Sequence, residues 1–195
     1  MSRTGKVERK TGETDIRVEV GLDGGGVTAS TGVGFFDHML DLLGRHGRLG
    51  LTVQATGDLE TGAHHTVEDV GIAIGQALDQ ALGDRAGIRR YGHGVVPMDE
   101  SLGVCAIDVS GRPYCRFDSE LPPVTIAGFE AELAEEFFRA VASNAKLTVH
   151  VGTRAGSNAH HMIESMFKAF ARALRDAVAI DPDQEGVPST KGTLT

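Results

Sequence analysis

The chain has 195 residues and 41% hydrophobic content, enough for one large domain or two small halves with a buried core. Its 19 Lys and Arg against 27 Asp and Glu give a net charge of −8, which argues against general nucleic-acid binding and requires any anion site to be local. The sequence contains no apolar run long enough for a membrane helix and begins without a secretory-type apolar segment, so we expect a cytoplasmic protein. Cys105 and Cys115 form no CxxC pair, and we expect inert thiols.

The first half of the chain predicts three strands, a helix, a strand and a helix. Residues 6–20 cover two strands, with the clearest period-two alternation at 14–20, and the glycine-rich stretch 23–26 predicts a turn. A third strand at 27–30 precedes a helix at 35–43, a strand at 51–55 and a long helix at 64–82.

The second half predicts the same order of elements. Strands are expected at 90–96, 104–109 and 114–117, a helix at 130–142, a strand at 147–151 and a helix at 160–179. The boundary falls near residues 83–88, which gives repeats at about 1–86 and 87–180 within one domain, and a loop or mobile arm at 181–195. The simplest packing is α+β, with two layers in each half, the helices on one face of the sheet, and the halves back to back.

A duplicated motif is the most informative feature of the sequence. The pattern HHxxE occurs at His64, His65 and Glu68, and again at His160, His161 and Glu164, with an interval of 160 − 64 = 96. The same interval carries residues 51–53 (LTV) onto 147–149 and residues 77–78 (AL) onto 173–174, without a gap. The two halves therefore derive from one repeated unit.

Both motifs lie on the polar face of a predicted amphipathic helix. At about 100° per residue, one third of the last helix carries polar side chains and the opposite side is apolar. The polar third holds His160, His161, Glu164, Lys168, Arg172 and Arg175, and the apolar side holds Met162, Ile163, Met166, Phe167, Phe170, Ala173 and Leu174. The earlier helix groups His64, His65 and Glu68 opposite Val67, Val70, Ile74, Ala77 and Leu78.

Two copies of a histidine and carboxylate cluster predict a site for two metal ions, because imidazole and carboxylate together suit intermediate first-row cations. Adjacent histidines point about 100° apart, so each member of a pair serves a different metal. His38, at the start of the first predicted helix, and its counterpart Glu136, reached with a two-residue slip, could complete the two shells. A helix-start charge pattern without metal is the alternative, and His46, His93 and His150, which lack a repeated partner, are interpreted as structural.

These residues resemble the imidazoleglycerol-phosphate dehydratase family of histidine biosynthesis, over nearly the whole chain. The segments that carry the resemblance are Phe36-Asp37-His38-Met39, the HHxxE segments at 64–69 and 158–164, residues 167–174, residues 108–114 with Ser110-Gly111-Arg112-Pro113-Tyr114, and Pro188-Ser189-Thr190-Lys191-Gly192. The resemblance implies the β-β-β-α-β-α duplicated fold, of the type named after domain 2 of ribosomal protein S5. It also implies an assembly of 24 subunits whose active sites lie between subunits and hold two Mn²⁺ ions.

The resemblance also implies the residue roles. One metal would take His38, His64, Glu68 and His161, and the other would take His65, His160, Glu164 and position 136. Position 136 is often histidine in the family and is Glu136 here, where a carboxylate is still a competent Mn²⁺ ligand. Glu13 matches the acid/base candidate, with Glu68 and Glu164 as further catalytic carboxylates. The substrate would contact Glu13 and the metal-site histidines His38, His64, His65, His160 and His161. Its phosphate would be bound by Arg90, Arg112, Lys168, Ser189, Thr190 and Lys191.

The expected reaction removes water from D-erythro-imidazole glycerol phosphate and gives imidazole acetol phosphate. Bound as imidazolate, the ring of the substrate would expel the hydroxyl of the adjacent carbon, and a carboxylate would take a proton from the next carbon. Lys168 lies two turns beyond His161, roughly 10 Å along the helix, which matches the reach from the imidazole to the phosphate.

Three other functions fit the sequence less well. A non-catalytic scaffold assembled by metal ions would need no phosphate-binding residues near the metals. A di-iron oxidase would need Glu-x-x-His on a four-helix bundle, and a zinc hydrolase would need His-Glu-x-x-His, which is absent. The interleaved strands disfavour the oxidase.

Overall fold

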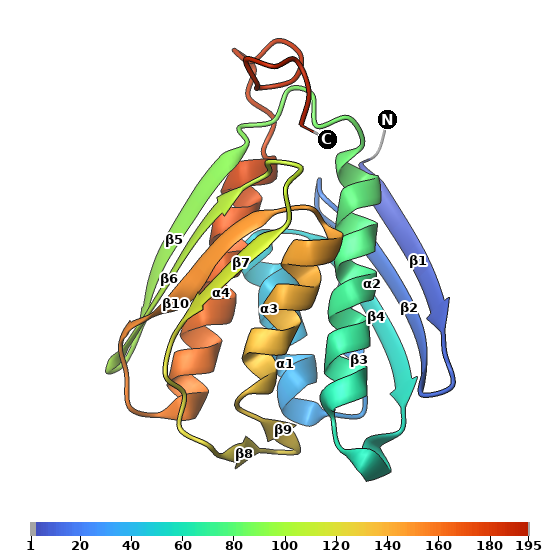
Figure 1. The fold of residues 1–195 in the computed structure, drawn as a ribbon, viewed down its shortest axis with the longest axis vertical. Coiled ribbons are helices and arrows are strands. Elements are labelled where there is room, and N and C mark those ends of the chain that lie inside the picture. Colours follow the sequence, from blue (N-terminus) through green and yellow to red (C-terminus); the bar gives the residue numbers. More distant parts are fainter. Residues whose placement is uncertain (1–2, 195) are drawn as a thin grey trace.

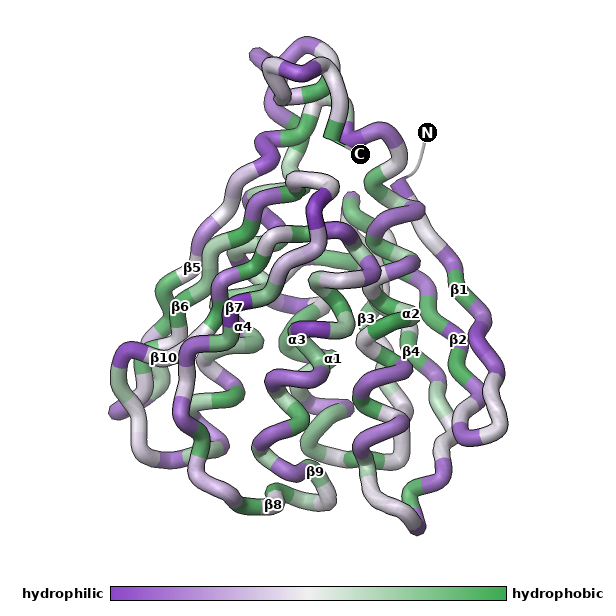
Figure 2. Tube along the Cα trace, viewed as in Figure 1, coloured by the Kyte–Doolittle hydropathy of each residue, from purple (hydrophilic) through white to green (hydrophobic). Residues whose placement is uncertain are grey.

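Two four-stranded sheets enclose four long helices in the computed structural model of the chain, which describes residues 3–194 (Figure 1). The first sheet consists of β1 (Thr4–Lys10), β2 (Thr14–Gly21), β3 (Val27–Ser30) and β4 (Gly50–Gly57) in the order β1-β2-β4-β3. Along β2, buried Ile16, Val18 and Val20 alternate with exposed side chains, and Figure 2 shows this alternation of hydropathy along β1 and β2. The apolar face of the sheet is therefore the one that meets the helices.

The helices of the first half are α1 (Gly34–Gly47) and α2 (His64–Leu82), and a short 3-10 turn, η1 (Leu59–Thr61), precedes α2. Since β3 and β4 are parallel, α1 is the crossover that connects them. The predicted helix at 64–82 and the predicted strand at 27–30 are confirmed with the same bounds.

The second half repeats this arrangement. Its elements are β5 (Tyr91–Met98), β6 (Ser101–Asp108), β7 (Tyr114–Asp118), α3 (Leu133–Asn144), β10 (Thr148–Ala155) and α4 (Ala159–Val178). The sheet order β5-β6-β10-β7 and the parallel β7–β10 pair match the first sheet position by position. The predicted α+β duplication is therefore confirmed.

A small hairpin distinguishes the second half from the first. It consists of β8 (Thr125–Ile126) and β9 (Phe129–Glu130), which lie between β7 and α3. The helix predicted from residue 130 therefore begins only at Leu133, because Glu130 pairs with Thr125. Phe129 is fully buried, and its ring packs against Phe35 and Phe36 at centroid distances of 5.5 and 5.8 Å. The hairpin thus braces the first turn of α1.

The helices of the two halves pack on one another across the centre of the molecule. Helix α1 packs against α4, and α2 packs against α3. A cluster of phenylalanine rings joins them: Phe36 meets Phe137, and Phe137 stacks on Phe167 at 5.0 Å. All the residues assigned from the sequence to the apolar faces of α2 and α4 are buried.

Equivalent glycines bring each sheet close to its helix. A Cβ built on Gly5 would lie 1.9 Å from the carbonyl oxygen of Ala77, and one built on Gly92 would lie 1.9 Å from that of Ala173. The strand glycines are 92 − 5 = 87 residues apart, whereas the helix residues are 173 − 77 = 96 apart. The second half is therefore nine residues longer, and the hairpin accounts for the difference in length.

The segment after α4 is a loop, as predicted, and it folds back on the start of the second half. Gly87 donates its backbone N–H to Gly186 O at 2.8 Å, and Ile88 and Ile180 form an isolated bridge. Among residues 3–194, no helix has the length and apolar character needed to cross a membrane. Burial raises the pKa of Cys115 to about 11 and raises that of Cys105 as well, in keeping with inert thiols.

Candidate active site

The α2 cluster consists of Glu13, Asp58, His64, His65 and Glu68 and lies at the N-terminal end of α2. His64 Nε2 lies 3.8 Å from Glu68 Oε2, one turn further along the helix. His65 has a carboxylate on each side, with Asp58 Oδ2 at 3.0 Å from Nδ1 and Glu13 Oε1 at 3.7 Å from Nε2. The hydrogen bond with Asp58 is the main cause that raises the pKa of His65.

The α4 cluster consists of His38, His160, His161, Glu164 and Lys168 and joins α4 to the start of α1. Glu164 is its centre: its carboxylate lies 3.1 Å from His160 Nε2, 3.5 Å from His38 Nε2 and 2.6 Å from Lys168 Nζ. Burial acts to raise the pKa of Glu164, but the hydrogen bond and charge of Lys168, followed by His160 and His38, outweigh it and hold the pKa below its ordinary value. Glu164 is therefore a buried, ionised carboxylate.

The start of α4 is held by an Asn cap and by the β5–β6 turn. Asn158 Oδ1 accepts the backbone N–H groups of His160 and His161. Glu100, in the turn, accepts the N–H groups of Ser157 and Asn158 through one oxygen and contacts His161 Nδ1 at 2.7 Å through the other. These contacts fix the direction of the His161 ring.

The third group, the tail cluster, lies near the opposite end of α4 and consists of Arg90, Asp108, Arg112 and residues 189–191. Arg90 binds the Asp108 carboxylate with two nitrogens, at 2.7 and 3.2 Å, and donates to Pro188 O at 2.9 Å. Arg112 is more exposed and lies 3.6 Å from Asp108. Arg90 has a φ of 72°, an uncommon conformation for a side-chain-bearing residue, and such conformations concentrate at functional sites.

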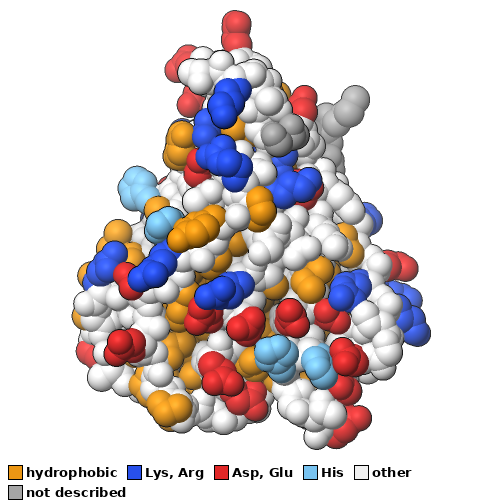
Figure 3. All heavy atoms as spheres, in the orientation of Figure 1, with side chains coloured by type: hydrophobic (Ala, Val, Ile, Leu, Met, Phe, Trp, Pro, Cys, Tyr) orange, Lys and Arg blue, Asp and Glu red, His pale blue; other side chains and the backbone are white. Residues whose placement is uncertain are grey.

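The three clusters are separate within one chain. Figure 3 shows Lys and Arg side chains gathered near the tail, and histidines among Asp and Glu side chains at the opposite end, where α2 begins. Among residues 3–194, no group of three or more His, Cys, Asp or Glu side chains is arranged to hold a metal ion. The four residues predicted for one metal, His38, His64, Glu68 and His161, are thus split between the α2 and α4 clusters.

Glu136 stands apart from both histidine clusters. It lies half-buried in the first turn of α3, and in the described part of the chain it forms no hydrogen bond or ion pair with either. Its role as a ligand stays a prediction. His46, interpreted as structural, lies near Lys168 and Arg172; burial, then these two cations, lower its pKa.

Sequence reasoning missed Asp58, Asp99, Glu100 and Phe35. Asp99 Oδ2 lies 3.7 Å from His161 Nε2, and the edge of the Phe35 ring packs on His160 at a centroid distance of 4.9 Å. One signal could have found Glu100: it lies 100 − 13 = 87 residues after Glu13, which is the interval between the strands of the two halves.

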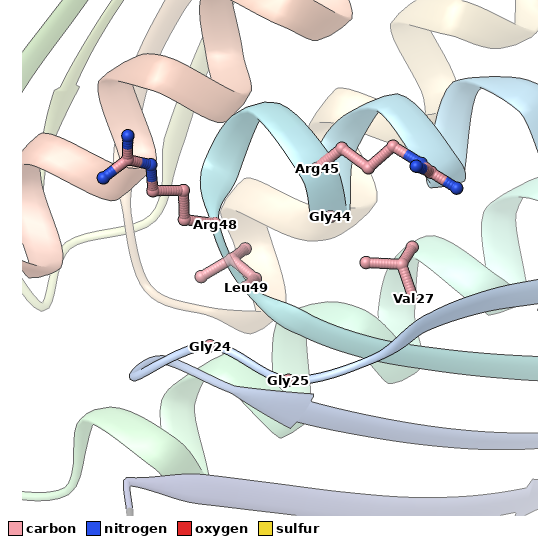
Figure 4. Close-up of a pocket in the computed structure, with 7 residues that line it drawn as sticks. All are labelled: Gly24, Gly25, Val27, Gly44, Arg45, Arg48 and Leu49. Carbon is pink, nitrogen blue, oxygen red and sulfur yellow. The ribbon is translucent and has the colours of Figure 1, made fainter.

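A hollow elsewhere on the surface does not belong to these clusters. It is lined by Gly24, Gly25, Val27, Gly44, Arg45, Arg48 and Leu49. Figure 4 shows that neither arginine side chain points at the Gly24–Gly25 turn, and Arg45 is paired with Asp41 at 2.6 Å. The hollow has no histidine or carboxylate in its lining and is not a candidate catalytic site.

Comparisons with known proteins agree on one family. The model of the family described as imidazoleglycerol-phosphate dehydratase matches residues 31–174. The dehydratase of Symbiobacterium thermophilum is 61% identical over 98% of this chain and 93% of its own length, and that of Acetivibrio thermocellus is 60% identical over the full length of both. The solved structure of the Staphylococcus aureus enzyme has 41% identity and a TM-score of 0.83, covering 91% of this chain and 99% of that one. The Pyrococcus furiosus enzyme has 35% identity and the same TM-score, covering 96% and 100%.

Proposed function

This chain belongs to the imidazoleglycerol-phosphate dehydratase family, a hydro-lyase of histidine biosynthesis, and from this premise we propose that its three clusters form one two-metal active site between copies of the chain. The observation that carries the proposal is that an incomplete set of metal-ligand side chains lies at the N-terminus of each duplicated helix. Each lacks the ligands that the other supplies. Each of the predicted ligand sets, His38, His64, Glu68 and His161, and His65, His160, Glu164 and Glu136, draws on both halves of the chain.

The tail cluster also supports a shared site. Arg90 N donates to Ala177 O at 2.9 Å, and Ala177 lies 17 residues beyond His160, roughly 25 Å along α4. That is more than twice the length of an imidazole joined to a phosphate by three carbons. A phosphate held by Arg90, Arg112, Ser189, Thr190 and Lys191 therefore cannot extend to the histidines of the same chain, so in this proposal the tail cluster serves a neighbouring copy.

The donor chemistry of the α2 and α4 clusters fits Mn²⁺. Imidazole nitrogens and carboxylate oxygens in nearly equal numbers suit an ion of intermediate character, and the thiols of Cys105 and Cys115 take no part. When bound, such ions act as Lewis acids and as a template for the substrate ring. The proposal has two Mn²⁺ ions per site, an assembly of 24 subunits and a cytoplasmic location, all of which stay predictions from the sequence.

The side chains of this chain would divide the remaining work. The carboxylate of Glu13, with 55% of its side chain exposed, is free to exchange a proton with the substrate carbon, while His65 Nε2 lies 3.7 Å away. Glu68 and Glu164 would supply carboxylate oxygens beside the reacting ring. Lys168, which already pairs with the carboxylate of Glu164, would bind the phosphate end as a cation on the same helix face.

Metal removal tests the proposal. We expect dialysis against a chelator to abolish water loss from imidazoleglycerol phosphate and high-mass assembly together, and added Mn²⁺ to restore both. His64→Ala and His160→Ala should abolish metal uptake and turnover, whereas His93→Ala, at an exposed histidine outside the three clusters, should retain them. Full activity in a preparation without divalent ions, or in either cluster variant, would contradict the metal assignment.

A further inference from the structure

The second histidine of each HHxxE motif meets a carboxylate at the same ring nitrogen. His65 Nδ1 lies 3.0 and 3.2 Å from the two oxygens of Asp58, and His161 Nδ1 lies 2.7 Å from Glu100 Oε2. In a neutral ring, a carboxylate at Nδ1 accepts the Nδ1–H and leaves the lone pair on Nε2.

Both carboxylates are themselves held in place. Thr61 donates its hydroxyl to Asp58 Oδ2 at 3.0 Å. Glu100 Oε1 accepts the backbone N–H groups of Ser157 and Asn158 at 3.2 and 2.9 Å, so only its other oxygen faces His161. Because each carboxylate is anchored by other groups, it dictates the orientation of the histidine rather than following it.

The two contacts come from different positions of the duplicated unit. Glu100 corresponds to Glu13, since both lie in the turn between the first two strands of their half. The two HHxxE motifs are 96 residues apart, and the residue 96 positions after Asp58 is Arg154, which is not a carboxylate. Duplication would have placed both carboxylates at equivalent positions. The same Nδ1 contact has instead been built twice from unrelated positions, which points to a function for the contact itself.

The rings of His65 and His161 are both partly exposed. Side-chain exposure is 38% for His65 and 27% for His161, and the nearest carboxylates on the Nε2 side, Glu13 and Asp99, each lie 3.7 Å away. Because Nδ1 of each ring is engaged by its carboxylate, Nε2 is the ring nitrogen left for an ion or a neighbouring copy.

We propose that Asp58 and Glu100 are positioning residues that keep the proton on Nδ1 of His65 and His161 and so present Nε2 as the metal-binding atom. The metal half of this inference rests on the proposed function, whereas the tautomer half does not. A carboxylate behind a metal-binding histidine fixes the tautomer and strengthens the ligand, and its loss weakens metal binding by roughly tenfold to a hundredfold.

Glu100→Gln is the sharpest test. The Gln oxygen must stay with the backbone N–H groups of Ser157 and Asn158, so the amide NH₂ faces His161 Nδ1 and makes it an acceptor. We expect nitrogen-15 NMR of the metal-free full chain to show wild-type His65 and His161 with Nδ1 protonated, and Glu100→Gln to move the proton of His161 to Nε2 without affecting His65. His65→Gln and His161→Gln assign the signals. Glu60→Gln, an exposed carboxylate near Asp58, serves as the control.

Mn²⁺ titration by calorimetry supplies the second readout. We expect Glu100→Gln and Asp58→Ala to bind Mn²⁺ roughly tenfold to a hundredfold more weakly than the wild type, and Glu60→Gln to match it. Wild-type protein with the proton on Nε2 of both histidines, or unchanged Mn²⁺ affinity in both variants, would overturn the inference. A wild-type protein that binds no Mn²⁺ refutes the proposed function and the metal half of the inference, and the NMR result then decides the tautomer half.

Discussion

In the α4 cluster, single residues determine the pKa of the Glu164 carboxyl group. Glu164 is 6% exposed, yet the contacts of Lys168, His160 and His38 keep its pKa below the ordinary value. The helix wheel placed Glu164 on the polar face of α4, and the structure shows that this face is covered by α1 at this point. A buried carboxylate with cationic and imidazole partners is ready to bind a cation without first losing a proton.

Lys168→Met tests whether Lys168 serves the substrate or only Glu164. Methionine keeps most of the length of the side chain and removes its charge. Because a hydrogen bond to a charged group contributes about 1.5–3 kcal/mol, we expect KM for imidazoleglycerol phosphate to rise roughly tenfold to a hundredfold. Bound Mn²⁺ at saturating metal should be unchanged, and Lys168→Arg should recover most of the affinity. Loss of bound metal in Lys168→Met would make Lys168 a structural partner of Glu164 instead of a phosphate ligand.

The HHxxE residues could be predicted from pattern alone because they repeat, whereas Glu13, Arg90 and Arg112 were predicted from the family resemblance. His64, His65, Glu68 and their counterparts could be identified because a repeat of local pattern is visible without a structure. The interval of 87 residues after Glu13 marks Glu100 in the sequence, but its contact with His161 spans 61 residues and depends on the β5–β6 turn reaching the start of α4. Partners of this kind follow from tertiary packing alone.

At the scale of elements, local periodicity predicted most of the fold. Strands and helices with several turns or alternations were found with small shifts, whereas the β8–β9 hairpin was missed because its two-residue strands carry no period. The packing of α1 on α4 and of α2 on α3 could not be predicted from the sequence either, because the apolar face of one helix can pack against several others.

Gly92→Ala tests the close approach of strand and helix. The new Cβ would lie 1.9 Å from Ala173 O, a backbone atom that cannot move without shifting α4. We expect the free energy of unfolding in urea to fall by about 1–3 kcal/mol or more, and Gly5→Ala to behave alike against Ala77. Gly26→Ala, where no atom lies within 4 Å of the added Cβ, should change stability by no more than about 0.5 kcal/mol. Equal stability of Gly92→Ala and Gly26→Ala would show that the sheet and helix are less tightly packed than described.

Phe129→Ala tests whether the β8–β9 hairpin stabilises the fold through its packing on α1. Removing a fully buried ring that contacts Phe35 and Phe36 should cost about 3–5 kcal/mol of unfolding free energy. Val124→Ala, at a 44% exposed position of the same segment, is the matched control and should stay within about 0.5 kcal/mol. The same urea titration measures both, and a loss below 1 kcal/mol for Phe129→Ala would place the hairpin outside the cooperative core.

At the scale of the whole molecule, the three clusters lie apart on one chain. The α2 and α4 clusters come from the duplicated N-terminal helix ends, and the tail cluster lies at the far end of α4. One chain therefore carries one copy of each part of the proposed active site, and these parts do not meet within the chain. Under the proposed function, the number of sites would equal the number of chains, and each site would be completed only by association.

Mixing two inactive variants tests this arrangement. In His64→Ala the α2 cluster is damaged, and in His160→Ala the α4 cluster is damaged, so each variant alone has no intact site. If a site takes its α2 cluster from one copy and its α4 cluster from another, random co-assembly with Mn²⁺ gives intact pairs in about one quarter of the interfaces. We therefore expect the mixture, dissociated by chelator and reassembled, to recover roughly that fraction of wild-type turnover, while each variant treated alone stays inactive. No recovery from a mixture shown by mass measurement to contain both chains in one assembly would mean that both clusters must act from the same copy. Such a result would require a rearrangement of α2 and α4 that the packing of α1 and α3 between the sheets opposes.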